Sequence, residues 1–152
     1  MQLSEAGLEL VKRSEGFREH VYKDVAGLLT IGYGHKLLAH ESFPNGITEP
    51  QAVALLARDL HSAELYVSHL VKVPIAQGQF DALVDFCFNM GAARLASSTL
   101  LTVLNHSRYQ DAAEQLLRWD IAGAEVSQGL KTRREAELQL WVGPAEAQKT
   151  AA

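Results

Sequence analysis

One short segment of the chain has strand periodicity, whereas the patterns around it are helical. Residues 20–23 and 28–33 read as two strands, because β-branched and aromatic residues are enriched in both. Residues 24–27, with the sequence Asp-Val-Ala-Gly, have the composition of the turn that would join them. The segment therefore predicts a small antiparallel hairpin within a mostly helical fold.

Side chains alternate along the second predicted strand. We expect Leu29 and Ile31 to face the interior, since residues two apart share one side of a strand. Thr30 and Gly32 would then face an opening, where the missing side chain of glycine leaves space for a ligand. The loop that follows is expected to span residues 36–47.

Helical patterns account for most of the remaining chain. A long helix is expected from Thr48 to about residue 71, because Thr48 and Gln51 form a capping box ahead of a regular apolar stripe. A second helix, at 77–90, is expected to form a core. The other predicted helices cover residues 4–14, 98–105, 109–119 and 130–141, and a tail without periodicity, expected to be mobile, covers 143–152.

The size and charge of the chain limit what it can be. Its 152 residues suit a single domain of roughly 100–200 residues. Its formal net charge of −4 argues against nucleic acid as a partner, because binding phosphates needs a basic surface. Lys131, Arg133 and Arg134 are the best candidates for a local basic patch.

Neither a disulfide nor a membrane span is expected. Cys87 is the only cysteine, and its apolar neighbours predict a buried side chain rather than a nucleophile. The N-terminus lacks the basic start and apolar run of a signal peptide, and no stretch of about 18 apolar residues occurs. We therefore expect a cytoplasmic protein that does not insert into membranes.

Three residues around the hairpin have the chemistry needed to split a glycosidic bond. Glu15 and Asp24 supply two carboxyl groups, one to protonate the leaving oxygen and one to assist attack from the other side. Thr30 supplies a hydroxyl that could hold the attacking water. Glu15 is expected at the C-terminus of the first helix, where the partial negative charge favours the neutral acid that a proton donor needs.

The sequence around these residues resembles the phage-type lysozymes, the endolysins of glycoside hydrolase family 24. Glu15, Asp24 and the run Thr-Ile-Gly-Tyr-Gly-His at 30–35 carry the resemblance most specifically. It continues through the helix at 77–90 to the sequence Gly-Leu-Lys-Thr-Arg-Arg-Glu-Ala-Glu at 129–137. It covers most of the chain.

The resemblance implies an α+β, mostly helical, two-lobed lysozyme-like fold in one domain, residues 1–152. A small lobe with a short antiparallel sheet, about residues 14–58, would be joined by the long helix to an all-helical lobe, about 1–13 and 72–142. The cleft for the substrate would lie between the lobes.

The resemblance also implies hydrolysis of the β-1,4 bond between N-acetylmuramic acid and N-acetylglucosamine in bacterial peptidoglycan. Glu15 matches the general acid, Asp24 the second carboxylate and Thr30 the hydroxyl that helps to place water. Such an endolysin is expected to be a monomer held in the host cytoplasm. A holin-type membrane lesion would release it to the periplasm and cell wall, where it lyses the host at the end of the phage cycle.

Three other functions stay open at this point. One is a phage structural lysozyme used at entry, which would normally be part of a larger tail protein than 152 residues allow. A lytic transglycosylase would cut the same bond without water, and it needs only one acid. A non-catalytic peptidoglycan-binding module would keep the cleft but lose an acid. The presence of Glu15, Asp24 and Thr30 together favours hydrolysis.

Further residues are expected to contact the substrate or to support the site. Alignment with the family implies four sugar contacts: Lys36, Phe88, Thr99 and Gln115. His35 could act as a base, although a structural hydrogen bond is the preferred interpretation, and Gly32 is expected beside the site. No cofactor is expected, and the spacing of the six histidines gives no metal-binding pattern.

Overall fold

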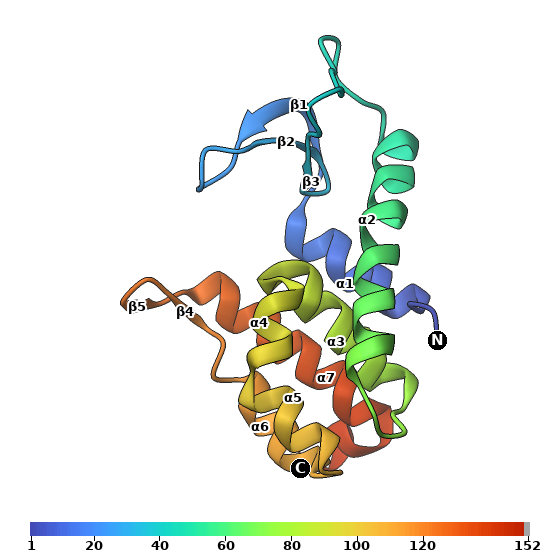
Figure 1. Cartoon of the computed structure of the whole chain (residues 1–152), viewed down its shortest axis with the longest axis vertical. Coiled ribbons are helices and arrows are strands. Elements are labelled where there is room, and N and C mark those ends of the chain that lie inside the picture. The colour runs from blue at the N-terminus through green and yellow to red at the C-terminus, as the bar shows by residue number, and fades with distance from the viewer. Residues whose placement is uncertain (151–152) are drawn as a thin grey trace. The chain divides into compact units, whose positions relative to one another are not determined.

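The chain folds into helices accompanied by two small antiparallel sheets (Figure 1). This computed structural model describes the backbone of residues 1–150 and the side chains of residues 1–143. The elements are, in chain order, α1 (Glu5–Glu15), β1 (Arg18–Lys23), β2 (Leu29–Gly32), β3 (His35–Lys36), α2 (Glu49–Leu70), α3 (Gln77–Met90), α4 (Ala92–Ser97), α5 (Thr99–Asn105), α6 (Tyr109–Leu116), β4 (Ile121–Ala122), β5 (Glu125–Val126) and α7 (Gln128–Thr150). The expected α+β, mostly helical fold class is confirmed.

The chain divides into two compact units. The smaller unit is Val11–Ser62, and the larger one combines Met1–Leu10 with Ala63–Ala152. Both α1 and α2 begin in one unit and end in the other. The smaller unit contains the three-stranded sheet, and the larger unit contains the other helices and the second sheet.

The sheet of the smaller unit has the strand order β1-β2-β3, and every pair is antiparallel. Its first turn is closed by Asp24, whose N–H donates to the Leu28 carbonyl and whose carbonyl accepts from the Gly27 N–H, each at 2.9 Å. The predicted hairpin and its turn are confirmed. The third strand was not predicted, because two residues are too short for a periodic pattern.

One expected burial in this sheet is wrong. Ile31 is fully buried, as predicted, but Leu29 is 50% exposed. Leu29 is the Cα partner of Lys23 next to the first turn, at the start of β2. Leu29 and Ile31 lie on the same side of the strand, but only Ile31 is covered by other residues. The alternation of side chains therefore gave the direction of Leu29 and not its exposure.

The long helix α2 begins as its capping signal predicts. The N–H of Thr48 donates to Gln51 Oε1 at 2.9 Å, and the N–H of Gln51 donates to Thr48 Oγ1 at 3.3 Å. The reciprocal bonds satisfy two N–H groups at the helix start, which otherwise lack partners. The helix ends at Leu70, one residue before the predicted position.

The core helix of the larger unit is α3, with the predicted bounds. Phe80, Leu83 and Phe86 are buried, and α3 packs closely on α7. At Gly78 a β-carbon would lie 1.9 Å from the Leu140 carbonyl oxygen, so only glycine permits this approach. Cys87 is buried as expected, and burial raises the pKa of its thiol to about 11.

Two arginines that were predicted to form a basic patch are buried in this helix pair instead. Arg133 donates from Nε and Nη2 to the two carboxylate oxygens of Asp85, at 2.9 and 2.8 Å. Arg134 donates from Nη2 to Glu137 Oε1 at 2.5 Å and to Asn89 Oδ1 at 2.9 Å. The prediction was wrong because both guanidinium groups are buried, where Asp85 on α3 and Glu137 on α7 accept their hydrogen bonds.

The remaining elements depart from the predicted pattern at several points. The short helix α4 and the β4–β5 hairpin were not predicted, and α6 ends at Leu116 rather than at residue 119. Helix α7 is interrupted at Gly143, which has φ 71°, and its backbone continues to Thr150. The predicted tail, 143–152, thus overlaps α7. Its last two residues lie outside the described range, and its mobility stays a prediction.

Among the described residues, no helix has the length and apolar character needed to cross a membrane.

Candidate functional site

Glu15 is the last residue of α1. Gly16 follows it with φ 70°, a left-handed conformation that ends the helix, and the Gly16 N–H donates to the Lys12 carbonyl at 2.9 Å. The carboxyl group of Glu15 lies against Gly34, between β2 and β3, where a β-carbon would stand 2.8 Å from Glu15 Oε2. The proton-donor candidate therefore lies at the turn between these two strands.

Asp24 follows β1 and uses both oxygens of its carboxylate. Oδ1 accepts hydrogen bonds from the N–H groups of Ala26 and Leu28, each at 2.9 Å, and Oδ2 accepts one from Lys36 Nζ at 2.5 Å. The hydrogen bond from Lys36, followed by that from Leu28, lowers the pKa of the Asp24 carboxyl group. Asp24 is therefore an anion at neutral pH and is held by both its own turn and β3.

Thr30 lies on β2 and is only 1% exposed, so the expectation that it faces an opening is wrong. Its Cα partners are Tyr22 on β1 and Lys36 on β3, and residues paired in this way point to the same side of a sheet. Thr30 Oγ1 donates to the Leu28 carbonyl at 2.9 Å. Because a hydroxyl has one proton and two lone pairs, Thr30 keeps the capacity to accept a hydrogen bond.

The strand β3 links the two carboxyl groups. Gly34, which contacts Glu15, precedes this strand, and Lys36, which binds Asp24, is part of it. Two residues of extended chain span about 7 Å. Glu15 and Asp24 are thus both held by one short stretch of backbone, with Thr30 on the neighbouring strand.

His35 holds β3 in place from within the smaller unit. It is 4% exposed, and its Nδ1 lies 2.7 Å from Asp59 Oδ2 while its Nε2 lies 2.9 Å from Glu41 Oε1. Burial alone would lower the pKa of His35, but the hydrogen bonds to Asp59 and Glu41 outweigh it and raise the pKa above its ordinary value of 6.5. Both ring nitrogens are thus occupied by carboxylate oxygens of the protein itself, which supports a structural role for His35.

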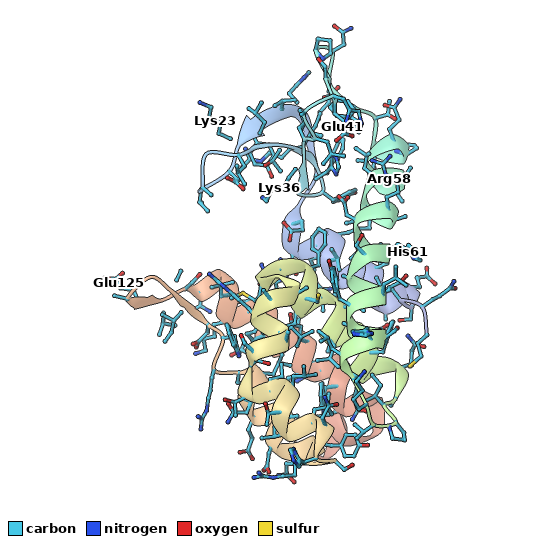
Figure 2. The ribbon with its side chains drawn as sticks, in the orientation of Figure 1. Lys23, Lys36, Glu41, Arg58, His61 and Glu125 are labelled. Carbon is cyan, nitrogen blue, oxygen red and sulfur yellow. The ribbon has the colours of Figure 1, made fainter. Side chains whose placement is uncertain are left out.

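Glu41 extends this network from β3 to the loop after it and to α2. Its Oε1 also accepts the N–H of Leu38 at 2.8 Å, and its Oε2 lies 3.7 Å from Arg58 Nη2 (Figure 2). The Leu38 N–H, followed by His35, lowers the pKa of Glu41. The strand that carries Lys36 is consequently fastened at its neighbour His35 by two elements.

Gly32 does not leave space for a ligand, which corrects the expectation. A β-carbon at Gly32 would lie 3.0 Å from the Ala52 β-carbon on α2. The missing side chain lets β2 pack closely on the helix. Gly32 is a packing residue next to Thr30 and Ile31.

The four predicted sugar contacts fall in both units. Lys36 lies in the smaller unit and binds Asp24. In the larger unit, Phe88 is half-buried near the end of α3, Thr99 is exposed at the start of α5, and Gln115 is half-buried near the end of α6. Their contact with a sugar stays a prediction.

Three residues that shape the site were not found from the sequence. Glu41 and Asp59 lie 6 and 24 positions from His35, and no sequence pattern relates them to it. Gly34 had a detectable signal, since glycine is the residue that most readily adopts the left-handed conformation of a tight turn. Among the described residues, no group of three or more His, Cys, Asp or Glu side chains is arranged to hold a metal ion.

Comparisons with known proteins agree with one another. The Phage lysozyme family model matches residues 12–137. The endolysin of Salmonella phage P22 is 41% identical over 137 residues, which cover 88% of this chain and 94% of that protein. The endolysin of Bacillus phage B103 is 42% identical over 145 residues, but the match covers 93% of this chain and 54% of that protein. The chain thus spans about half the length of the latter relative.

Solved structures give the same result. The muramidase domain of SpmX from Asticaccaulis excentricus is 37% identical with a TM-score of 0.87, and the match covers 94% of this chain and 99% of that one. A variant of P22 lysozyme is 38% identical with a TM-score of 0.83, over the same shares of the two chains. The family match, the identities and the common fold together show that the chain belongs to the phage lysozyme family, a family of glycoside hydrolases.

Proposed function

We propose that the chain is an endolysin-type muramidase, which hydrolyses the β-1,4 bond between N-acetylmuramic acid and N-acetylglucosamine in peptidoglycan. Relatives named endolysin and a solved structure named muramidase, at 37–42% identity, support this activity. The observation that carries the proposal is the arrangement around β3. The Glu15 carboxyl group lies against Gly34 just before this strand, the Asp24 carboxylate binds Lys36 on it, and the buried residue Thr30 is the Cα partner of Lys36.

Glu15 is the proton donor in this mechanism. As the bond between the sugar ring and the bridging oxygen breaks, the Glu15 carboxyl proton passes to that oxygen and leaves with the departing sugar. Proton transfer requires the donor to be within hydrogen-bond reach of the leaving oxygen. The close contact with Gly34 supports this role, because it restricts where the carboxyl group can point.

Asp24 and Thr30 act on the attacking water. Asp24 stabilises the positive charge that builds on the sugar ring and accepts one proton of the water. Thr30 accepts a hydrogen bond from the same water, since its own proton is engaged by the Leu28 carbonyl. The water oxygen forms the new bond to the anomeric carbon as the bond to the bridging oxygen breaks.

Contacts with the glycan strand are proposed for the larger unit as well. Phe88, Thr99 and Gln115 would contact sugars of the glycan strand. Phe88 is suited to stack on a sugar ring, while the hydroxyl of Thr99 and the amide of Gln115 are suited to hydrogen-bond sugar hydroxyl groups.

The biological proposal rests on the resemblance to the endolysins. The protein acts as a monomer on peptidoglycan at the end of a phage cycle, after a holin-type lesion releases it from the host cytoplasm. Produced inside Gram-negative cells, the chain should leave the culture turbid until chloroform permeabilises the membranes, and the culture should then clear. Lysis without chloroform would contradict the need for a lesion.

Product analysis tests the chemistry. Purified peptidoglycan digested with the wild-type chain should give reducing muropeptides, each one water heavier than the anhydro product of a transglycosylase. Glu15→Gln should remove activity while the circular dichroism spectrum stays unchanged, and Asp24→Asn should be severely impaired. Anhydro products would reassign the chain to the transglycosylases, and full activity of Glu15→Gln would remove Glu15 from the mechanism.

A further inference from the structure

Lys36 binds Oδ2 of Asp24, the carboxylate oxygen that the turn after β1 does not occupy. The turn occupies Oδ1 with two backbone N–H groups, whereas the ammonium group of Lys36 donates to Oδ2 at 2.5 Å. The Lys36 side chain is 55% exposed and that of Asp24 is 17% exposed, so the pair lies at the surface of the sheet. A backbone clamp fixes one oxygen of this carboxylate, and a single side chain fixes the other.

The strand register places Lys36 where it can do this. Lys36 is the Cα partner of Thr30, so both side chains emerge on the same side of the sheet. Lys23 precedes Asp24 directly in the sequence, but it is the Cα partner of Leu29 and emerges on the opposite side. Figure 2 labels both lysines, Lys23 at the end of β1 and Lys36 by β3. The strand register, and not proximity in sequence, therefore decides which lysine forms the ion pair with Asp24.

The backbone at Lys36 is also held firmly. Its neighbour His35 is buried and is bound at both ring nitrogens by Asp59 and Glu41. The ammonium group consequently extends from a fixed point of the backbone. This reduces the number of arrangements that the ion pair can adopt.

We propose that Lys36 is a positioning residue of the reaction, which holds Asp24 Oδ2 next to Thr30 and keeps the carboxylate charged and in one orientation. This inference rests on the proposed function, because it takes Asp24 as the second carboxylate. It assigns Lys36 a role different from a sugar contact: the side chain acts on Asp24 and not on the substrate.

Two measurable consequences follow from this role. A nearby cation lowers the pKa of a carboxyl group by about 1–3 units, and an exposed pair belongs at the lower end of that range. Without Lys36, Asp24 would become protonated at a higher pH. The acid limb of the pH–activity profile would therefore shift to a higher pH. Loss of orientation would lower kcat, because small misplacements of a reacting group are costly, whereas KM would change little.

The experiment compares Lys36→Met, Lys36→Arg and the control Lys23→Met, all in the full chain. The 13C NMR titration of the Asp24 carboxyl group, assigned by its loss in Asp24→Asn, is measured beside the pH dependence of kcat and KM. Lys36→Met should raise the Asp24 titration midpoint and the acid limb of kcat by about one pH unit. It should lower kcat about tenfold at neutral pH. Lys36→Arg should largely restore both, and Lys23→Met should match the wild type.

The outcomes separate the two proposals. If Lys36→Met raises KM alone, and the Asp24 titration does not move, Lys36 is a sugar contact and the positioning role is wrong. If Asp24→Asn keeps normal turnover, the proposed function itself fails at Asp24. Lys36→Gln serves as a second neutral variant if Lys36→Met does not give the wild-type circular dichroism spectrum.

Discussion

The carboxyl group of Glu15 lies against the α-carbon of Gly34, and no side chain fits between them. A β-carbon at Gly34 would stand 2.8 Å from Glu15 Oε2 and 3.2 Å from Cδ. Gly34 also has φ 75°, a conformation that residues with side chains rarely adopt. The position of the proposed proton donor therefore depends on a turn outside its own helix.

Gly34→Ala should impair activity far more than stability. The left-handed conformation costs a residue with a β-carbon about 1–2 kcal/mol, whereas displacement of the Glu15 carboxyl group should lower kcat/KM by about 100-fold. Wall-lysis kinetics and urea denaturation measure the two effects separately.

Gly123→Ala is the matched control for this prediction. Gly123 has φ 66° in the β4–β5 turn, and a β-carbon there meets no atom within 4 Å. It should show the same loss of stability with near-normal turnover. Equal losses of activity in the two variants would indicate that backbone strain, and not the contact with Glu15, explains the effect.

Thr30→Val should separate the hydroxyl group from the shape of the side chain. Valine fills the buried space but can neither donate to the Leu28 carbonyl nor accept from a water molecule. We expect a loss of about 1 kcal/mol in stability from the hydrogen bond and about 100-fold in kcat. Thr30→Ser retains the hydroxyl and should retain most of the turnover; an inactive serine variant with an active valine variant would argue against the proposed water contact.

The His35 network should give stability a defined pH dependence. Burial opposes protonation, but Asp59 and Glu41 raise the pKa of His35 in the folded state above 6.5. The folded state thus holds this proton more tightly, so the stabilisation is fully present below pH 6.5 and is lost as pH rises through the folded-state pKa. The pKa of Glu41 is lowered by the Leu38 N–H and by His35, so its contribution is present above pH 4.5 and is lost as pH falls through its folded-state pKa.

His35→Gln measures this dependence. Its cost, the difference in unfolding free energy from the wild type, should be about 2 kcal/mol and should be largest between pH 4.5 and 6.5. The difference should shrink as the pH rises further. The exposed residue His40, changed to Gln, is the control, and a cost of His35→Gln that grows toward alkaline pH would show that the network does not act as described.

Asp85→Asn should be among the most destabilising single changes in the larger unit. It breaks the buried two-bond ion pair between Asp85 and Arg133, and the loss of one member of such a pair typically costs about 3–5 kcal/mol. Asp111→Asn breaks an exposed ion pair with Arg108 and should cost at most about 1 kcal/mol. Urea denaturation compares the two, and equal costs would mean that burial does not decide the value of the Asp85 pair.

Elements with local signals were predicted well. The turn at Asp24 and the capping box of Thr48 and Gln51 are formed by groups within four residues of each other, so the sequence alone specifies them. The bounds of α3 follow from its continuous apolar face. By contrast, β3, β4 and β5 have two residues each, too few for any periodicity, and they form only because a partner strand is present.

The sequence by itself determined the fold class, the family and the residue types available for chemistry, because hydrophobic periodicity, turn residues and the motif at 30–35 are all local properties of the chain. Only the tertiary structure decided the partner of each functional side chain: Gly34 for Glu15, Lys36 for Asp24 and the two carboxylates for His35. These contacts depend on the register of a two-residue strand and on the helix packed beside it. Both are set by the free energy of the assembled unit, which no single stretch of the sequence contains.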